Sequence, residues 1–168
     1  MKRTLFAKLF HWIGNKTPEA LRALRGWMVR HFIASCGAGV SIGRKSFIHK
    51  HVTLGDGSGV GYGCHLNGPV HVGNNVMMGP WVLVYTQNHR LDRTDIPMRQ
   101  QGMGDIRPVT IEDDVWIGAR VILLPGDTVG KGSVIGAGAV VSRDIPPYSV
   151  AVGNPCRVVR TRKQEDTI

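Results

Sequence analysis

The sequence predicts an all-β fold, a parallel β-helix, and three observations point to it. Aliphatic residues recur at every sixth position along most of the chain. A small or slim residue lies two positions before each of them, and glycine often follows directly. The 168 residues include 22 glycines but only 4 Trp, 4 Phe and 3 Tyr, which suits a narrow interior and many tight turns. A single domain of short strands and corners is therefore expected.

The six-residue repeat occurs in two stretches, each with the same phase throughout. Residues two apart on a strand share a face, so each hexad sends a small and an aliphatic side chain inward before the chain turns. A helix would need apolar spacings of three and four instead. Among the small inward positions only Asp127 is charged. The aliphatic positions are Ile42, Ile48, Leu54, Val60, Leu66, Val72, Met78 and Val84, then Ile111, Ile117, Leu123, Val129, Ile135 and Val141.

Two helices are predicted before the repeat. Residues 2–13 carry apolar side chains at helical spacing, and a second helix is expected to begin with Thr17 as its N-cap and to end at Gly37. We expect residues 1–38 to form a helical cap over the open end of the β-helix. Residues 39–153 then form the β-helix, and residues 154–168 a basic C-terminal tail.

The positive charge is concentrated at the N-terminus. The net charge is +9, and residues 1–35 hold seven basic side chains against one acidic residue, Glu19. Because the same segment is amphipathic, an anionic membrane surface or a phosphorylated ligand is favoured over nucleic acid as its partner. Lys8 and His11 interrupt the apolar N-terminus, and no apolar run is long enough to span a bilayer. The sequence predicts a cytoplasmic protein, with peripheral contact at the inner membrane as an alternative role for the helices.

The repeat is interrupted once, and the interrupting segment contains the candidate catalytic residue. Val84 and Ile111 are 27 residues apart, which is not a multiple of six, so residues 86–108 are predicted to leave the coil as a loop. A polar loop of this length is more often functional than a simple connection. His89 stands where the coil ends and the loop begins, and histidine is the usual general base near neutral pH.

The TQNH sequence, the loop and the returning VWIG resemble the hexapeptide-repeat acyltransferases, in the sugar O-acetyltransferase branch that includes maltose and galactoside acetyltransferases. The resemblance covers roughly residues 39–160. It implies a left-handed parallel β-helix, acetyl-CoA as acyl donor and no metal. It also implies that His89 takes the proton from a sugar hydroxyl, and that the chain forms a homotrimer with each site between two subunits.

Further site residues follow from the same resemblance. Trp116 would lie beside the active site. The acceptor-binding Asn and Asp of the family have no clear counterparts, which leaves Asn67 and Asn88 as candidates. The residues implied for acetyl-CoA are Ala119, Ala137, Ser142, Arg143, Arg157 and Arg160; the fork of arginine suits phosphate.

Three other functions fit the sequence less well. A zinc site of the γ-class carbonic anhydrase type needs three histidines, two of them separated by four residues, and position 94, five after His89, is a threonine. Streptogramin-type xenobiotic acetyltransferases share the NHR start of the loop but have a longer loop. A scaffold without catalysis would need neither the loop nor its histidine. The sequence thus predicts an acetyl-CoA-dependent O-acetyltransferase that acts on a sugar hydroxyl of a surface or exopolysaccharide precursor.

Overall fold

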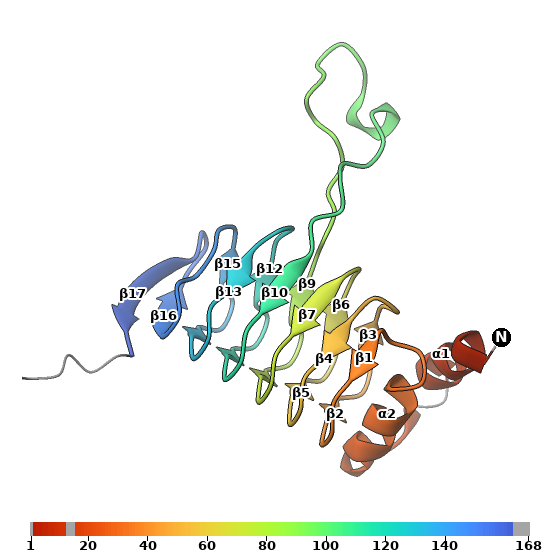
Figure 1. The fold of residues 1–168 in the computed structure, drawn as a ribbon. Coiled ribbons are helices and arrows are strands. Elements are labelled where there is room, and N and C mark those ends of the chain that lie inside the picture. The colour runs from red at the N-terminus through yellow and green to blue at the C-terminus, as the bar shows by residue number, and fades with distance from the viewer. Residues whose placement is uncertain (1, 13–15, 163–168) are drawn as a thin grey trace, which may run out of the picture.

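The computed structural model describes residues 2–12 and 16–162 and has three parallel sheets wound into a left-handed β-helix (Figure 1). Sheet A contains β1 (Ser35–Cys36), β4 (Thr53–Leu54), β7 (Val70–Val72), β10 (Val109–Ile111) and β13 (Thr128–Val129). Sheet B contains β2 (Ser41–Ile42), β5 (Gly59–Val60), β8 (Met77–Met78), β11 (Trp116–Ile117), β14 (Val134–Ile135), β16 (Ser149–Val152) and β17 (Arg157–Thr161). Sheet C contains β3 (Phe47–Ile48), β6 (His65–Leu66), β9 (Leu83–Val84), β12 (Ile122–Leu123) and β15 (Val140–Val141).

The register of the sheets shows that three hexads make one coil. Ser35 pairs with Thr53, and Thr53 pairs with His71 one coil further on. His71 then pairs with Thr110, because the chain makes its excursion into the loop within this coil. The regular register resumes at once, with Thr110 beside Thr128. The coils before and after the loop are therefore stacked in one β-helix, and the same side chains of each hexad face inward in both.

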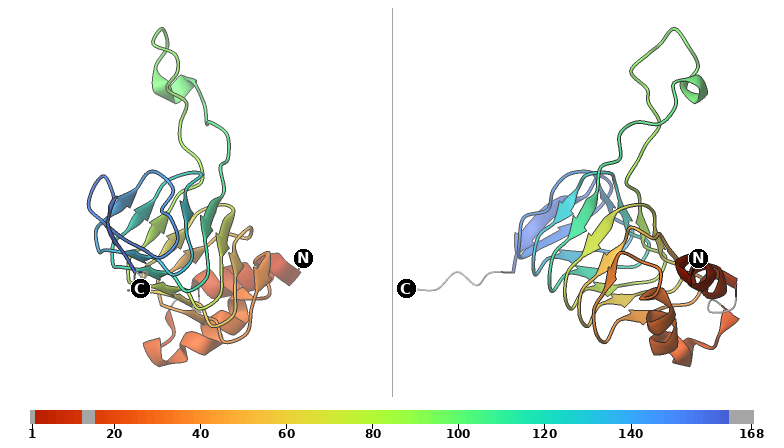
Figure 2. Two further views of the ribbon diagram at one scale, coloured as in Figure 1. Left: turned by 60° about the vertical axis from the view of Figure 1, so that its left-hand side comes forward. Right: turned by 45° about the vertical axis from the view of Figure 1, so that its right-hand side comes forward.

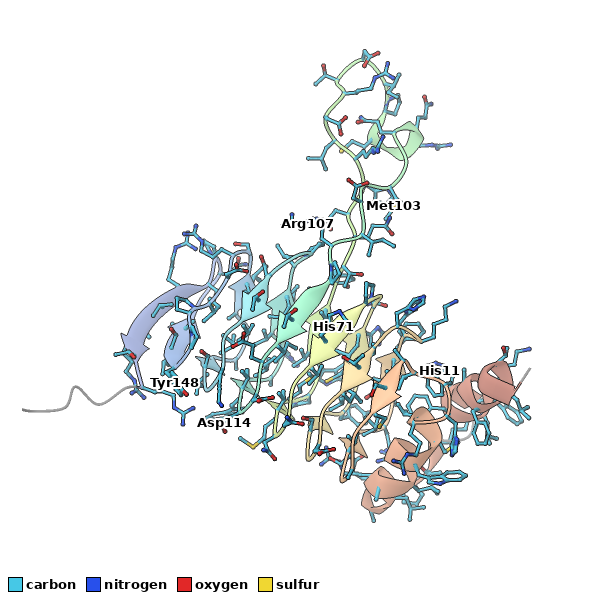
Figure 3. The ribbon with its side chains drawn as sticks, viewed as in Figure 1. His11, His71, Met103, Arg107, Asp114 and Tyr148 are labelled. Atoms are coloured by element: carbon cyan, nitrogen blue, oxygen red, sulfur yellow. The ribbon has the colours of Figure 1, made fainter. Side chains whose placement is uncertain are left out.

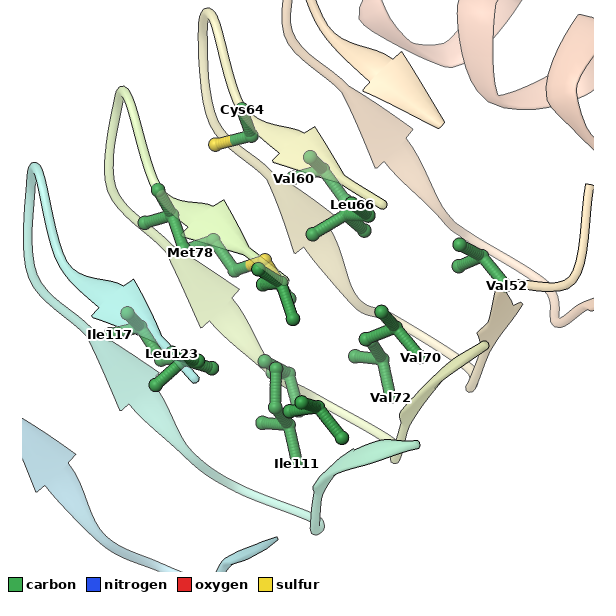
Figure 4. Close-up of a cluster of buried hydrophobic side chains, with 14 of the residues drawn as sticks. Val52, Val60, Cys64, Leu66, Val70, Val72, Met78, Ile111, Ile117 and Leu123 are labelled. Atoms are coloured by element: carbon green, nitrogen blue, oxygen red, sulfur yellow. The ribbon is translucent and has the colours of Figure 1, made fainter. Parts of the chain in front are cut away.

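The interior of the β-helix is a column of aliphatic side chains, shown in close-up in Figure 4. The small inward residues help to bind one coil to the next. Ser58 Oγ donates a hydrogen bond to the carbonyl of Gly73 (2.7 Å), and Cys64 Sγ makes the same contact with Gly79 (3.2 Å). The hydroxyl and thiol groups of the hexads are thus paired although they are buried.

The N-terminal helices cover one end of the β-helix, as Figure 2 shows. Helix α1 (Lys2–Trp12) packs against α2 (Arg22–Val29), which directly follows the 3₁₀ turn η2 (Glu19–Leu21). Phe10 and Phe32 are buried and extend the aliphatic core into this cap. Ile13, where the first helix was expected to end, lies outside the described residues. Among the described helices none is long and apolar enough to cross a membrane.

The ends of the β-helix differ from the sequence prediction in four places. Thr17 does not cap a helix; its Oγ1 accepts a hydrogen bond from the Arg25 guanidinium (2.8 Å). Helix α2 stops at Val29 rather than near Gly37, because residues 30–34 turn to bring β1 alongside β4. Strand β1 therefore starts the β-helix inside the segment 1–38 assigned to the cap. At the other end, β17 pairs antiparallel with β16, so part of the expected tail is a strand.

The loop of residues 85–108 projects away from the coils between β9 and β10 and contains one 3₁₀ turn, η3 (Met98–Gln100) (Figures 1 and 2). Its tip is held by polar contacts within the loop. Arg93 forms an ion pair with Asp95, and the Gln101 side chain donates to the carbonyl of Arg93 (2.7 Å).

Candidate functional site

The two arms of the loop run side by side where they leave the β-helix, and His89 lies in this stem. His89 forms an isolated antiparallel bridge with Met103, and Gly104 N–H donates to the carbonyl of Asn88 (2.8 Å). Nearer the coils, Arg107 N–H donates to the carbonyl of Thr86 (2.8 Å). Met103 and Arg107 mark the returning arm in Figure 3. The stem therefore fixes the backbone of His89 while its side chain remains exposed.

A cavity of about 320 Å³ opens at the base of the stem. It lies along the corners that join sheet C to sheet A, called here the C–A edge (residues 49–52, 67–69, 85–108, 124–127 and 142–144). Polar and aromatic side chains from three successive coils meet in it, and Met103 connects it to the stem. Its lining is His49, His51, Asn67, Gly68, Pro69, Tyr85, Thr86, Gln87, Met103 and Ile106.

The hydrogen bonds around this cavity hold the stem to the coil below. Thr86 Oγ1 donates to the carbonyl of Asn67 (2.8 Å), and the Gln87 side chain donates to the carbonyl of Gly104 (2.8 Å). The Nδ1 atom of His49 accepts the backbone N–H of His51 (3.3 Å). Burial, followed by the charges of His51 and Lys50, lowers the pKa of His49, so its ring is neutral near pH 7.

Asn67 lines this cavity, as one of the two acceptor candidates, whereas Asn88 lies in the stem with its side chain exposed. His49 and His51 also line this cavity, although their outward phase in the six-residue repeat indicates only solvated surface positions. A signal was present: Asn67 and Tyr85 follow His49 at steps of one coil, so the three residues stack at one corner.

The residues implied for acetyl-CoA fall on two borders of sheet C. Ala119 and Ala137 lie on the corners that join sheet B to sheet C, called here the B–C edge (residues 43–46, 61–64, 79–82, 118–121 and 136–139). Ser142 and Arg143 are exposed on the C–A edge instead. These two pairs of residues are separated because β15 (Val140–Val141) runs from the B–C edge to the C–A edge.

Trp116 and the two C-terminal arginines belong to sheet B. The Trp116 side chain is 52% exposed on β11. Arg157 and Arg160 are exposed on β17, and Arg157 Nη1 donates to the carbonyl of Cys156 (2.8 Å). Within one chain, then, the structure brings His89 and Asn67 to one edge and leaves Trp116, Ala119 and Ala137 on other parts of the prism.

Asp127 is buried on the C–A edge, one coil beyond the loop. Its Oδ2 has no hydrogen-bond partner among the described residues. Burial and the nearby Asp144 raise its pKa, which Arg107 and the backbone of Leu124 partly offset. The one charged residue among the small inward positions is thus buried with an unpaired carboxylate oxygen.

The described residues outside this site offer few metal ligands or reactive groups. In the ranges 2–12 and 16–162, no three His, Cys, Asp or Glu side chains gather as a metal site would require. The thiol of Cys64 is buried in the interior, and burial raises its pKa to about 11, which makes it a poor nucleophile.

Comparisons with known proteins agree with the fold. Residues 108–143 match the family described as bacterial transferase hexapeptide (six repeats). Galactoside O-acetyltransferase of Escherichia coli K12 is 35% identical over 98% of this chain and 70% of its own length. A crystal structure of a maltose O-acetyltransferase from Clostridium difficile 630 superimposes with a TM-score of 0.82 at 34% identity, over 96% of this chain and 85% of that one.

A third comparison concerns the acyl donor. A hexapeptide-repeat acetyltransferase from Vibrio cholerae, solved in complex with acetyl coenzyme A, has a TM-score of 0.81 at 27% identity and covers 96% of this chain and 88% of that one. This protein is therefore an acetyltransferase, and the chain belongs to the hexapeptide-repeat acetyltransferase family.

Proposed function

We propose that this protein transfers the acetyl group of acetyl-CoA to a sugar hydroxyl, with His89 as general base. The observation that carries the proposal is the position of His89, exposed on a hydrogen-bonded stem beside Met103 and the polar cavity. The imidazole takes the hydroxyl proton while the oxygen attacks the thioester carbonyl. The C–S bond then breaks, and the imidazolium returns the proton to the departing CoA thiolate, so no covalent enzyme intermediate or metal is needed.

The cavity at the C–A edge suits a carbohydrate. Asn67 supplies an amide, and His49 supplies a neutral ring with hydrogen-bonding nitrogens. Tyr85 and Met103 add apolar surface on which the face of a sugar ring can pack. Names of relatives point to the same class of acceptor, since they include galactoside and maltose O-acetyltransferases.

The donor site requires a second copy of the chain. In one subunit the C–A edge holds His89, whereas Ala119, Ala137 and Trp116 lie elsewhere on the prism. The proposed trimer packs the loop of one subunit against the B–C edge of the next, so that His89 meets the acetyl-CoA contacts across the interface. Arg143, Arg157 and Arg160 are proposed to bind the phosphates of the cofactor.

The N-terminal cap is proposed to hold the enzyme at the cytoplasmic face of the membrane, beside a lipid-linked precursor of a surface polysaccharide. Leu5 and Trp12 are 65% and 69% exposed on α1, and Lys8 lies between them. Liposome co-sedimentation tests this role. We expect the double variant L5S/W12S to lose binding to anionic vesicles, whereas equal, negligible binding by both proteins would reject it.

The proposed reaction is tested by the release of free CoA thiol from acetyl-CoA. The panel contains mono- and oligosaccharides and one streptogramin, and His65→Ala serves as control because His65 is an exposed histidine on sheet C. We expect turnover on a sugar, retained in His65→Ala and reduced roughly 10²- to 10⁴-fold in His89→Ala. Turnover on the streptogramin alone would transfer the proposal to xenobiotic acetylation, and unchanged turnover in His89→Ala would show that another group is the base. Silence of the wild-type protein on the whole panel would favour a non-catalytic scaffold.

A further inference from the structure

A cluster of arginines surrounds one carboxylate where α2 meets the first coils. Glu19 lies within 3.4 to 3.6 Å of three guanidinium groups. These belong to Arg22 and Arg25 of α2 and to Arg44 of the B–C edge. The backbone N–H of Arg44 also donates to the same carboxylate (3.4 Å). Three positive charges therefore share a single negative one.

Arg25 is the structural member of the cluster. It is fully buried, and its Nε donates to the carbonyl of Ile42 (2.7 Å). Its Nη1 donates to Thr17 Oγ1 (2.8 Å) and to the carbonyl of Pro18 (2.9 Å). These contacts join α2 to strand β2. Its Nη2 donates to the backbone carbonyl of Glu19 (3.2 Å) and to the Glu19 carboxylate (3.4 Å), so only one of its hydrogen bonds depends on the Glu19 side chain.

Arg22 and Arg44 are much less well satisfied. The Nε atom of each is buried, and neither has a hydrogen-bond partner among residues 2–12 and 16–162. Their distances to the Glu19 carboxylate, 3.5 and 3.6 Å, exceed the roughly 2.7–2.9 Å of a good charge-assisted hydrogen bond. Both side chains remain partly exposed, at 43% and 38%, so a solute can reach them.

Two neighbouring features add to the excess of positive potential. The first turn of α2 carries arginines and no acidic residue, the reverse of what the helix dipole favours. On the B–C edge, Lys45 Nζ lies 5.6 Å from the centroid of the Tyr62 ring and the Arg44 guanidinium 5.9 Å. Tyr62 in turn makes an edge contact with Trp81, so the cations border an aromatic surface.

We infer that Arg22 and Arg44 form a binding site for a phosphate group, which Glu19 occupies as a placeholder when no ligand is bound. A phosphate offers several strong acceptor oxygens, whereas a carboxylate has only two to share among three guanidinium groups. Glu19 is 46% exposed and can turn into solvent when a phosphate replaces it. The site lies at the N-terminal end of the B–C edge, away from the arginines proposed to bind the phosphates of the donor.

The test is calorimetric titration of the full-length protein with inorganic phosphate at constant ionic strength and without acetyl-CoA. We expect saturable binding that weakens roughly tenfold or more in Arg44→Gln and in Arg22→Gln. Glu19→Gln should bind phosphate several-fold more tightly, because it removes the competing carboxylate, and a purely structural carboxylate would not have this effect. The charge-matched control Lys131→Gln, which changes an exposed residue on a different edge, should bind as the wild type does.

Two results of the same titration would overturn the site. One is that phosphate binds neither the wild type nor Glu19→Gln, and the other is that Arg44→Gln binds phosphate as tightly as the wild type does. Arg44→Lys guards against a folding defect, because it keeps the charge and should retain part of the affinity. Two competition arms identify the source of the phosphate. A nucleoside diphosphate sugar that displaces phosphate indicates a soluble ligand, and phosphatidylglycerol vesicles that bind wild type but not Arg44→Gln indicate a lipid headgroup. Because no acetyl transfer is measured, failure here leaves the proposed reaction untouched.

Discussion

A Cβ atom on Gly61 would lie 2.2 Å from the carbonyl oxygen of Gly79, one coil further along the β-helix. The backbones of successive coils approach most closely at these corners, which explains why glycine so often follows the aliphatic residue of a hexad. The atoms that this Cβ would meet all belong to the backbone of Met78 and Gly79, so no change of rotamer can make room for it.

Gly61→Ala is therefore expected to destabilise the protein by about 3 kcal/mol. The matched control is Gly138→Ala, since Gly138 has a φ of +73° but no atom within 4 Å of its Cβ position. Gly138→Ala should lower the free energy of unfolding by only about 1 kcal/mol, which is the cost of the backbone strain at positive φ. Urea unfolding of both variants measures the difference, and equal losses would contradict the close approach of the coils.

Asp127→Asn is expected to stabilise the protein at pH 7 by about 1–2 kcal/mol. The folded state raises the pKa of Asp127 above 3.8, so the native protein holds this proton more tightly than the unfolded chain does. The penalty for the ionised form is fully present above the folded pKa and disappears as the pH falls below 3.8. The charge of Asp144 raises the pKa of this carboxyl and the charge of Arg107 lowers it, and the effect of Asp144 is the larger.

Urea unfolding of the Asp127 variant at about pH 7 and pH 4 measures this effect. The gain over wild type should be large at neutral pH and should shrink in acid. A variant less stable than wild type at pH 7 would mean that the carboxylate has a favourable native interaction.

Cys64 is expected to resist alkylation in the folded protein. Its pKa of about 11 leaves very little thiolate at pH 8, and the side chain is inaccessible within the coils. Labelling with iodoacetamide followed by peptide mass analysis should modify Cys64 only in urea, and the half-buried Cys36 should react faster in the native state. Rapid native labelling of Cys64 would show that the coils open locally.

The repeating part of the fold was predictable because one constraint acts on every hexad. An inward pair such as Cys64 and Leu66 must fit a narrow interior, and this requirement repeats with the same period until the loop interrupts it. The position of His89 at the base of the loop followed from the same arithmetic. The outward phase of a corner residue such as His49 predicts only a solvated surface, and its place in the cavity emerges from the stacking of Asn67 and Tyr85 on it at steps of one coil.

The ends were less predictable because they depend on contacts that no periodicity encodes. The sequence around Thr17 matches a helix cap, but the buried guanidinium of Arg25 competes for its hydroxyl. The C-terminal basic residues resemble a tail, but β16 has a free border on which β17 pairs. The arrangement of subunits in the proposed trimer is likewise not encoded by the periodicity of a single chain.

The central claim is that His89 of one subunit acts on acetyl-CoA bound to the B–C edge of the next. Subunit complementation tests it most directly, with His89→Ala as one parent and Ala137→Trp, which blocks the B–C edge, as the other. Each parent should be inactive alone. Oligomers co-expressed at equal levels should regain roughly a quarter of wild-type CoA release, because a quarter of the interfaces then combine an intact His89 with an intact edge. Mixed oligomers as inactive as their parents would contradict the claim and place the whole site within one subunit.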